Sequence, residues 1–191
     1  MKRPFRNLPW QKAPTFGLIF VVLVLFQVGC FSSRTDPFPF EEFIKYDHNP
    51  ILSPRGNGFE SDGVFNPAAI VVNDTIYLFY RAQDENGRSS IGLAKSVDGI
   101  NFERNPEPLI VAEEDYEIPG GCEDPRIVRV LDTYYLTYTA YDGNTARLAL
   151  ASSNDLLHWE KHGPLLPSSG WTKSGAIITE QVNGRYGMYF G

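Results

Sequence analysis

Short apolar runs separated by polar turns recur along residues 65–167. In the first of two similar stretches, the runs cover residues 70–72, 76–80 and 91–94, with a last run around Phe102. The turns between them contain Asn73-Asp74 and the polar residues 84–87. Runs of this length, rich in β-branched and aromatic residues and bounded by Asn, Asp and Gly, are typical of β-strands joined by tight turns. No segment shows sustained helical periodicity, so the pattern predicts an all-β fold.

The same arrangement is repeated further along the chain. Residues 65–110 can be laid on residues 123–167, which places Pro67 on Pro125 and Tyr80 on Tyr138, both 58 positions apart. A third copy begins near Lys173, where residues 184–189 match residues 133–138 at an offset of 51. A Ser-x-Asp-x-x-x-aromatic stretch also recurs at an offset of 57, with the members Ser96, Asp98 and Phe102, then Ser153, Asp155 and Trp159.

Four short strands in a unit of roughly 50 residues are typical of a propeller blade. We expect the aromatic residue of the Ser-x-Asp stretch to lie on the outer strand and to pack between blades. A propeller has at least four blades, so the 191 residues predict about two and a half blades of a longer protein. Alone, such a piece would leave open sheet edges, and we expect it to be inactive.

The first 40 residues have the composition of an export signal and a tether. A positive leader with Lys2 and Arg3 precedes an apolar run at residues 16–28, which is too short to span a membrane. Gly29-Cys30 follows directly and is similar to the lipobox of bacterial lipoproteins. We therefore predict a lipoprotein-type signal peptide at 1–30, a tether at 31–40, and the propeller segment at 41–191.

Lipidation of Cys30 would place the protein outside the cytoplasm, anchored to a bacterial membrane in the periplasm or at the cell surface. Cleavage without lipid and a retained anchor are the alternatives. The chain has only two cysteines, so lipidation would leave Cys122 alone and no intrachain disulfide is expected.

Composition narrows the range of partners. The net charge is −6, and no basic run occurs beyond the first dozen residues, so we do not expect nucleic acid as a partner. Aromatic residues make up 14% of the chain, which suits both a β-sheet core and a site where rings stack on sugars. His48, His158 and His162 are scattered along the sequence, so we expect neither a metal site nor a cofactor.

The candidate chemistry lies at the start of the inner strands, which line the channel of a propeller. The repeat places Asn66, Asp124 and Gly175 at one equivalent position. Strand alternation predicts that Asp124 and Arg126 point to one face, and Glu123 to the other. A carboxylate beside a guanidinium suits a polyhydroxylated ligand, and the carboxylate could donate a proton. Alternatively, Asn66 only starts a turn with Pro67, and Asp124 and Arg126 form a structural ion pair.

Several motifs together resemble glycoside hydrolase family 130: NPAAIVVNDTIYLFYRA, GGCEDPRI, YTAYDG, and Lys173 followed by NGRYGMY. This family contains mannoside phosphorylases and β-mannosidases on a five-bladed β-propeller, and the resemblance covers residues 40–191. It implies that Asp124 is the catalytic acid, whose proton passes through a sugar hydroxyl. The residues that the resemblance assigns to substrate binding are Asn66, Arg81, Glu123 and Arg126 for the sugar, and Lys173 for phosphate in the phosphorylases.

One difference between this sequence and the phosphorylases of the family favours hydrolysis. In the phosphorylases a basic residue follows a Met-Leu pair, at a place that Phe190-Gly191 occupies in this chain. We therefore expect hydrolysis of β-mannosides with inversion, with water as nucleophile and a second carboxylate beyond Gly191. One alternative is a β-mannoside phosphorylase that uses inorganic phosphate as co-substrate. Another is a non-catalytic, glycan-binding surface lipoprotein, which would bind oligosaccharide without turnover.

Overall fold

The structure is a computed structural model that describes residues 42–167 and 169–191. Residues Tyr46–Gly191 form one compact unit. The predicted signal peptide, the tether and Cys30 lie outside the described residues. No helix in the described part of the chain has the length and apolar character needed to span a membrane.

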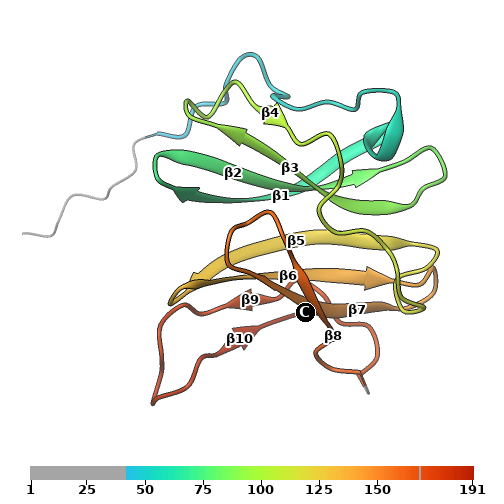
Figure 1. Cartoon of the computed structure of the whole chain (residues 1–191), viewed down its shortest axis with the longest axis vertical. Helices are drawn as coiled ribbons and strands as arrows, with labels where there is room; N and C mark the ends of the chain where they lie inside the picture. The colour runs from blue at the N-terminus through green and yellow to red at the C-terminus, as the bar shows by residue number, and fades with distance from the viewer. Residues whose placement is uncertain (1–41, 168) are drawn as a thin grey trace, which may run out of the picture. The chain divides into compact units, whose positions relative to one another are not determined.

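The unit contains two antiparallel groups of four strands, called here the first and the second sheet, which one pairing joins into a single eight-stranded sheet, and a two-stranded sheet that begins a third group (Figure 1). A short 3-10 turn, η1 (Gly58–Glu60), precedes the first sheet. The strands of the first sheet are β1 (Gly63–Val72), β2 (Thr75–Gln83), β3 (Ser89–Ser96) and β4 (Glu103–Arg104). Those of the second sheet are β5 (Gly121–Val130), β6 (Thr133–Tyr141), β7 (Ala146–Ser153) and β8 (Glu160–Pro164). The third unit contributes β9 (Ala176–Ile177) and β10 (Met188–Tyr189).

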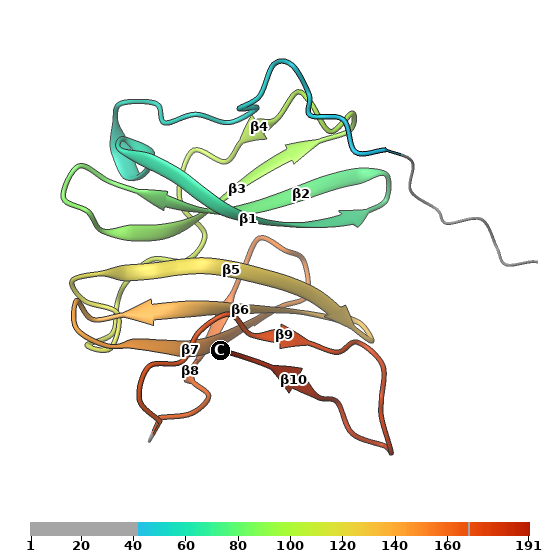
Figure 2. The same cartoon turned by 180° about the vertical axis from the view of Figure 1, so that it is seen from behind.

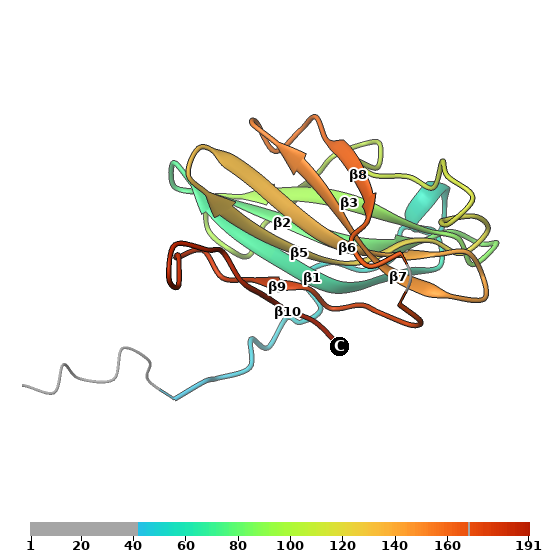
Figure 3. The same cartoon turned by 90° about the horizontal axis from the view of Figure 1, so that it is seen from below.

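The two complete sheets are stacked, and the same arrangement is visible from behind (Figure 2). A single parallel pairing, between Ser89 of β3 and Gly121 of β5, connects the hydrogen bonding of one sheet to that of the other. Seen from below, the inner strands β1, β5 and β9 follow one edge of the stack, and the outer strand β8 lies at the opposite edge (Figure 3). This confirms the predicted blades: two are complete and a third is begun.

Local sequence explains the turns between the strands of each blade. Asn73 and Asp74 both have positive φ, which is the geometry of a two-residue hairpin between β1 and β2. The repeated Ser-x-Asp stretch is a polar turn, in which Ser96 donates a hydrogen bond to Asp98 Oδ1 and the same carboxylate accepts the amide of Asn101. Ser153 and Asp155 repeat this turn in the second blade. The Ser and Asp of this stretch are therefore structural.

The main core lies between the two blades. Fully buried side chains from both sheets meet there, among them Phe79, Leu93, Leu136 and Leu156. Trp159, just before β8, meets Phe79 of the first blade edge to face, with ring centroids 5.6 Å apart. The prediction of an aromatic residue packed between blades is confirmed for Trp159. Phe102 instead packs on a smaller cluster around Tyr80 in the first blade.

The second blade encloses a buried carboxylate. Glu117 lies in the loop before β5, and its side chain is fully buried. Tyr138 donates a hydrogen bond to it at 2.8 Å, Lys161 Nζ lies 2.8 Å from Oε2, and the amides of Glu113 and Glu114 donate to the same oxygen. Burial raises the pKa of Glu117, but the hydrogen bonds outweigh it and the net pKa is lowered. The carboxylate is therefore ionised at neutral pH.

The first blade repeats this carboxylate–tyrosine–cation clasp. Glu60, in η1, accepts a hydrogen bond from Tyr80 at 2.9 Å. Arg104 of β4 lies 2.9 Å from Glu60, and Arg55 lies 3.2 Å from it. In each blade the clasp joins the loop before the inner strand to the second and fourth strands. It therefore fixes the segment that leads into the inner strand.

Candidate active site

Both complete inner strands are interrupted at the same place. In β5 the pairing with β6 runs from Glu123–Thr139 directly to Arg126–Thr137, so two residues face one on the partner strand. The pairing of β1 with β2 has the same break after Phe65. This is a β-bulge, and the residues within it, Asn66 and Asp124, have left-handed φ values of 45° and 50°.

The bulge overturns the predicted alternation at the start of β5. Asp124 and Arg126 were expected on one face and Glu123 on the other. Instead, Glu123 and Asp124 both approach Arg81, with oxygen–nitrogen distances of 2.9 and 3.8 Å. The guanidinium of Arg126 donates to the carbonyl of Pro125 and lies along an apolar groove between the inner strands. The extra residue in the bulge turns Asp124 to the side of Glu123, which simple alternation does not allow.

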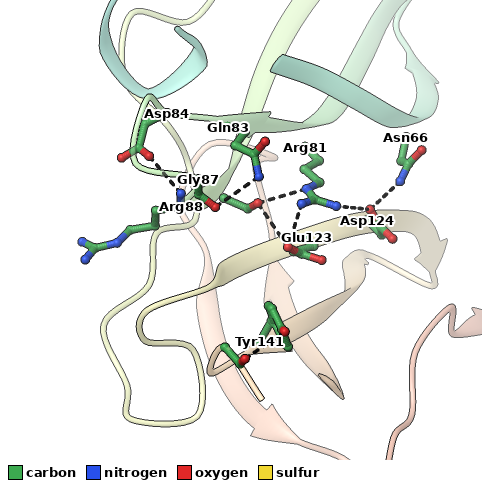
Figure 4. A network of polar contacts seen from close by, with 11 residues as sticks. Asn66, Arg81, Gln83, Asp84, Gly87, Arg88, Glu123, Asp124 and Tyr141 are labelled. Atoms are coloured by element: carbon green, nitrogen blue, oxygen red, sulfur yellow. Dashed lines mark hydrogen bonds and ion pairs between the residues drawn. The ribbon is translucent and has the colours of Figure 1, made fainter. Parts of the chain in front are cut away.

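Four of the predicted residues meet in one polar cluster (Figure 4). Asn66 donates a hydrogen bond of 2.6 Å to Asp124 Oδ1, although the two residues are 58 positions apart. Arg81 lies between the two carboxylates and also donates to Ser89 Oγ at 2.9 Å. Ser89 in turn donates to Glu123 Oε1 at 3.2 Å. The first blade therefore supplies an amide and a guanidinium, and the second blade supplies two carboxylates.

Ser89 and Gly121 are site residues that the sequence reasoning missed. Ser89 is fully buried, and its amide donates to the carbonyl of Gly120 at 2.9 Å. Gly121 has φ +114°, and a Cβ placed on it would lie 2.1 Å from the carbonyl oxygen of Ser89. The glycine is needed for this close approach of two backbones. The Gly-Gly pair is part of the motif GGCEDPRI, but the motif alone does not reveal its close approach to Ser89.

Burial and the neighbouring groups of the cluster shift the pKa of Glu123 in opposite directions. Burial raises the pKa of Glu123, and the negative charge of Asp124 raises it further. Arg81, the hydrogen bond from Ser89 and the charge of Lys173 act in the opposite direction, and the net pKa is raised. A carboxylate with a raised pKa close to a second carboxylate is suited to proton chemistry on a polar ligand.

Lys173 belongs to the third unit, and the structure corrects the alignment of that unit. The amide and carbonyl of Lys173 both bond with Gly191, and the next pairing is Ala176 with Tyr189. Two residues therefore face Phe190 alone, which is the same bulge as in the first two blades. The residue with left-handed φ is Ser174, at 56°. The predicted equivalence of Gly175 with Asp124 was wrong by one position, because the match relied on residue types and not on the bulge.

The same correction applies to the second strand of the third unit. Phe190, and not Tyr189, occupies the place of Tyr80 and Tyr138, opposite the bulge. Phe190 has no hydroxyl group, so it cannot donate the hydrogen bond that completes the clasp in the first two blades.

Comparison with known proteins identifies relatives along nearly the whole described chain. The profile of glycoside hydrolase family 130, described as beta-1,4-mannooligosaccharide phosphorylase, matches residues 43–191. A beta-1,2-mannobiose phosphorylase from Thermoanaerobacter sp. is 36% identical over 162 residues, covering 76% of this chain and 53% of that protein. A 1,2-beta-oligomannan phosphorylase from the same organism is 38% identical over 150 residues, covering 73% and 50%.

A solved structure gives the same relationship in three dimensions. It is described with glycoside hydrolases of family 130 that target beta-1,2 mannosidic linkages in Candida mannan. It superposes with a TM-score of 0.75 at 33% identity, covering 81% of this chain and 54% of that one. The predicted all-β propeller fold is confirmed. The chain spans about half the length of the curated relatives that it matches.

Proposed function

The chain belongs to glycoside hydrolase family 130, and from this membership and the polar cluster we propose that the complete protein cleaves β-1,2-mannosidic linkages by phosphorolysis. The relatives named as phosphorylases of β-1,2-linked mannosides support the linkage and the reaction. The expectation of hydrolysis from the sequence is not confirmed. The observation that carries the proposal is the meeting of Asn66, Arg81, Glu123 and Asp124 at the bulges of two neighbouring inner strands.

In the proposed reaction, Asp124 is the proton donor. Asn66 holds one of its oxygens at 2.6 Å and so orients the carboxyl group. As the bond between the anomeric carbon and the glycosidic oxygen breaks, the leaving sugar takes the proton of Asp124, through a sugar hydroxyl as the family resemblance implies. A phosphate oxygen attacks the anomeric carbon from the opposite face, which gives α-mannose 1-phosphate. A proton from phosphate restores Asp124.

Lys173 supports phosphate as the acceptor. Its side chain is exposed, and among the described residues it forms no ion pair within 4.0 Å. Its charge nevertheless reaches Glu123, whose pKa it lowers. A lysine that is close to the site but not engaged by a carboxylate can bind an anion. Arg81, by contrast, is already held between Glu123 and Asp124, and we propose that it lines the sugar pocket. Arg126 lies outside this cluster, along the groove between the inner strands, and its role in sugar binding stays a prediction.

Hydrolysis remains the second candidate, because two observations favour it. The superposed structure is described with family members that are hydrolases. In this chain, Phe190-Gly191 also lies where the phosphorylases carry a basic residue. With water as acceptor, the same cluster would serve, and Asp124 would keep its role.

One assay separates the candidates. The full-length protein is incubated with β-1,2-mannobiose, with and without inorganic phosphate, and the products are separated. Phosphorolysis predicts mannose 1-phosphate that forms only when phosphate is present. Equal release of free mannose in both reactions would establish hydrolysis instead. Binding of mannobiose without any product would support the non-catalytic, glycan-binding alternative.

We further propose that the protein is exported and anchored through a lipidated Cys30. The support is the charged leader, the short apolar run and the Gly29-Cys30 junction. An exported enzyme would meet oligosaccharide or larger glycans as its substrate.

A further inference from the structure

Three successive inner strands share one unusual backbone feature. Each is broken by a bulge at the same register, and in each bulge a residue other than glycine has left-handed φ: Asn66, Asp124 and Ser174, at 45°, 50° and 56°. This conformation is uncommon for such residues and disfavoured by their Cβ atoms. Glycine would adopt it without that penalty, and in the third strand a glycine stands at the very next position, Gly175. The strands therefore keep a polar side chain at a place that glycine would occupy more easily.

Side chains at this register converge on one point. Asn66 and Asp124 come from different blades, yet their side chains are in hydrogen-bonding contact at 2.6 Å. The third inner strand continues this arrangement across the next boundary, because Thr137, the partner of Arg126 in β6, donates a hydrogen bond of 2.7 Å to the carbonyl of Gly175. Lys173 and Ser174 occupy the places of Glu123 and Asp124, so the register predicts that the Ser174 side chain faces the same point from the third strand.

The hydroxyl of Ser174 is available to bind a ligand. The residue is exposed, and within residues 42–167 and 169–191 its hydroxyl forms no hydrogen bond. The equivalent side chains are engaged, Asn66 as a donor and Asp124 as an acceptor. A serine hydroxyl can do both, as a sugar hydroxyl can.

From this juxtaposition we propose that Ser174 is a substrate-binding residue whose hydroxyl bonds to a hydroxyl group of the mannosyl unit held against Asp124. The proposal rests on the proposed function, because it takes a β-mannoside as the ligand. It assigns to the third blade a direct contact with the sugar, besides the contact of Lys173 with the acceptor.

The test compares three variants of the full-length protein with the wild type. Ser174→Ala removes the hydroxyl, and Ser174→Gly removes both the hydroxyl and the Cβ that disfavours left-handed φ. Ser152→Ala makes the same chemical change on the outer part of the second blade, where, among the residues that the structure describes, the serine hydroxyl bonds only to His162. The measurements are KM and kcat with β-1,2-mannobiose and with phosphate, the dissociation constant of mannobiose by calorimetry, and the melting temperature.

Both substitutions at Ser174 are expected to lower kcat/KM for mannobiose by about 3- to 10-fold, which is the loss of one neutral hydrogen bond. The KM for phosphate stays within about twofold, and Ser152→Ala matches the wild type. Ser174→Gly melts at a higher temperature than Ser174→Ala, since glycine relieves the strained φ. A Ser174→Gly protein that is more stable than Ser174→Ala but has the same lowered kcat/KM separates a binding role from a structural one.

Wild-type kinetics for mannobiose in both Ser174 variants would overturn the assignment. So would a change confined to the KM for phosphate. If the wild type gives no product with either acceptor, the proposed function fails, and the calorimetric titration still decides the role of Ser174. Mannobiose binding that is equal in wild type and Ser174→Ala would then overturn it, and weaker binding in the variant would support it.

Discussion

Replacing Glu117 by glutamine tests whether the clasp stabilises the second blade. The change keeps the shape of the side chain but removes its charge. In the native protein this carboxylate accepts hydrogen bonds from Tyr138, from Lys161 and from the amides of Glu113 and Glu114, and it is fully buried. Hydrogen bonds to a charged group contribute about 1.5–3 kcal/mol, against about 0.5–1.5 kcal/mol between neutral groups.

Glutamine can retain some of these contacts as neutral hydrogen bonds. Breaking a buried ion pair costs about 3–5 kcal/mol when it leaves one charge alone. In Glu117→Gln, Lys161 still has its ion pair with Glu113, at 3.0 Å, so the loss of stability is smaller than that. We therefore expect Glu117→Gln to lower the free energy of unfolding by about 2–3 kcal/mol.

The assay is urea denaturation of the full-length protein at several pH values. Glu114→Gln is the matched control, because it is the same substitution three residues away on an exposed side chain, and it should change stability by less than about 0.5 kcal/mol. The folded-state pKa of Glu117 is lowered from its ordinary value of 4.5, so its contribution is fully present above pH 4.5. The contribution is lost as the pH falls through the lowered pKa, and the difference between wild type and Glu117→Gln should then shrink.

Two results would refute this reasoning. The first is a Glu117→Gln protein as stable as Glu114→Gln at pH 7. The second is a difference that stays constant as the pH is lowered to 3, since it would show that the charge of Glu117 is not the source of the stability.

Three further predictions concern the site and the anchor. Gly121→Ala should lower kcat/KM for mannobiose at least tenfold and reduce stability, because its Cβ would lie 2.1 Å from the carbonyl of Ser89; unchanged kinetics would show that the junction of the blades does not position the cluster. Arg81→Gln should raise the pKa of Glu123 further, since Arg81 now lowers it, and the acidic limb of the pH–rate profile should move to higher pH; a profile that keeps its acidic limb would mean that Glu123 does not control it. Cys30→Ala should abolish labelling by radioactive fatty acid, and label retained in that variant would exclude Cys30 as the lipidated residue.

The repeat made the blades predictable, because strand length, turn residues and the 58-residue spacing of Tyr80 and Tyr138 are properties of the local sequence. The bulge was not predictable in the same way. It depends on how β5 pairs with β6, and its effect is to bring Glu123 and Asp124 to one side. The one-position error at Gly175 has the same origin, since only the pairing of Lys173 with Gly191 reveals the correct register.

The clasp left a signal in the sequence that passed unnoticed. Glu60 and Glu117 are 57 positions apart, as are Arg104 and Lys161, so the repeat contains both the acid and the cation. Neither pair belongs to a motif with a known chemistry, and an isolated glutamate in a loop is usually solvated. The burial of Glu117 is evident only from the structure, in which the loop before the inner strand packs against Tyr138.

The turnover of Asp124→Asn in the full-length protein tests directly whether Asp124 is the proton donor, because asparagine keeps the shape of the side chain but has no acidic proton to transfer. With β-1,2-mannobiose and phosphate, we expect a loss of about 10²–10⁴-fold in kcat, with the dissociation constant of mannobiose close to that of the wild type. Turnover near the wild-type rate would contradict the assignment of Asp124 as the proton donor.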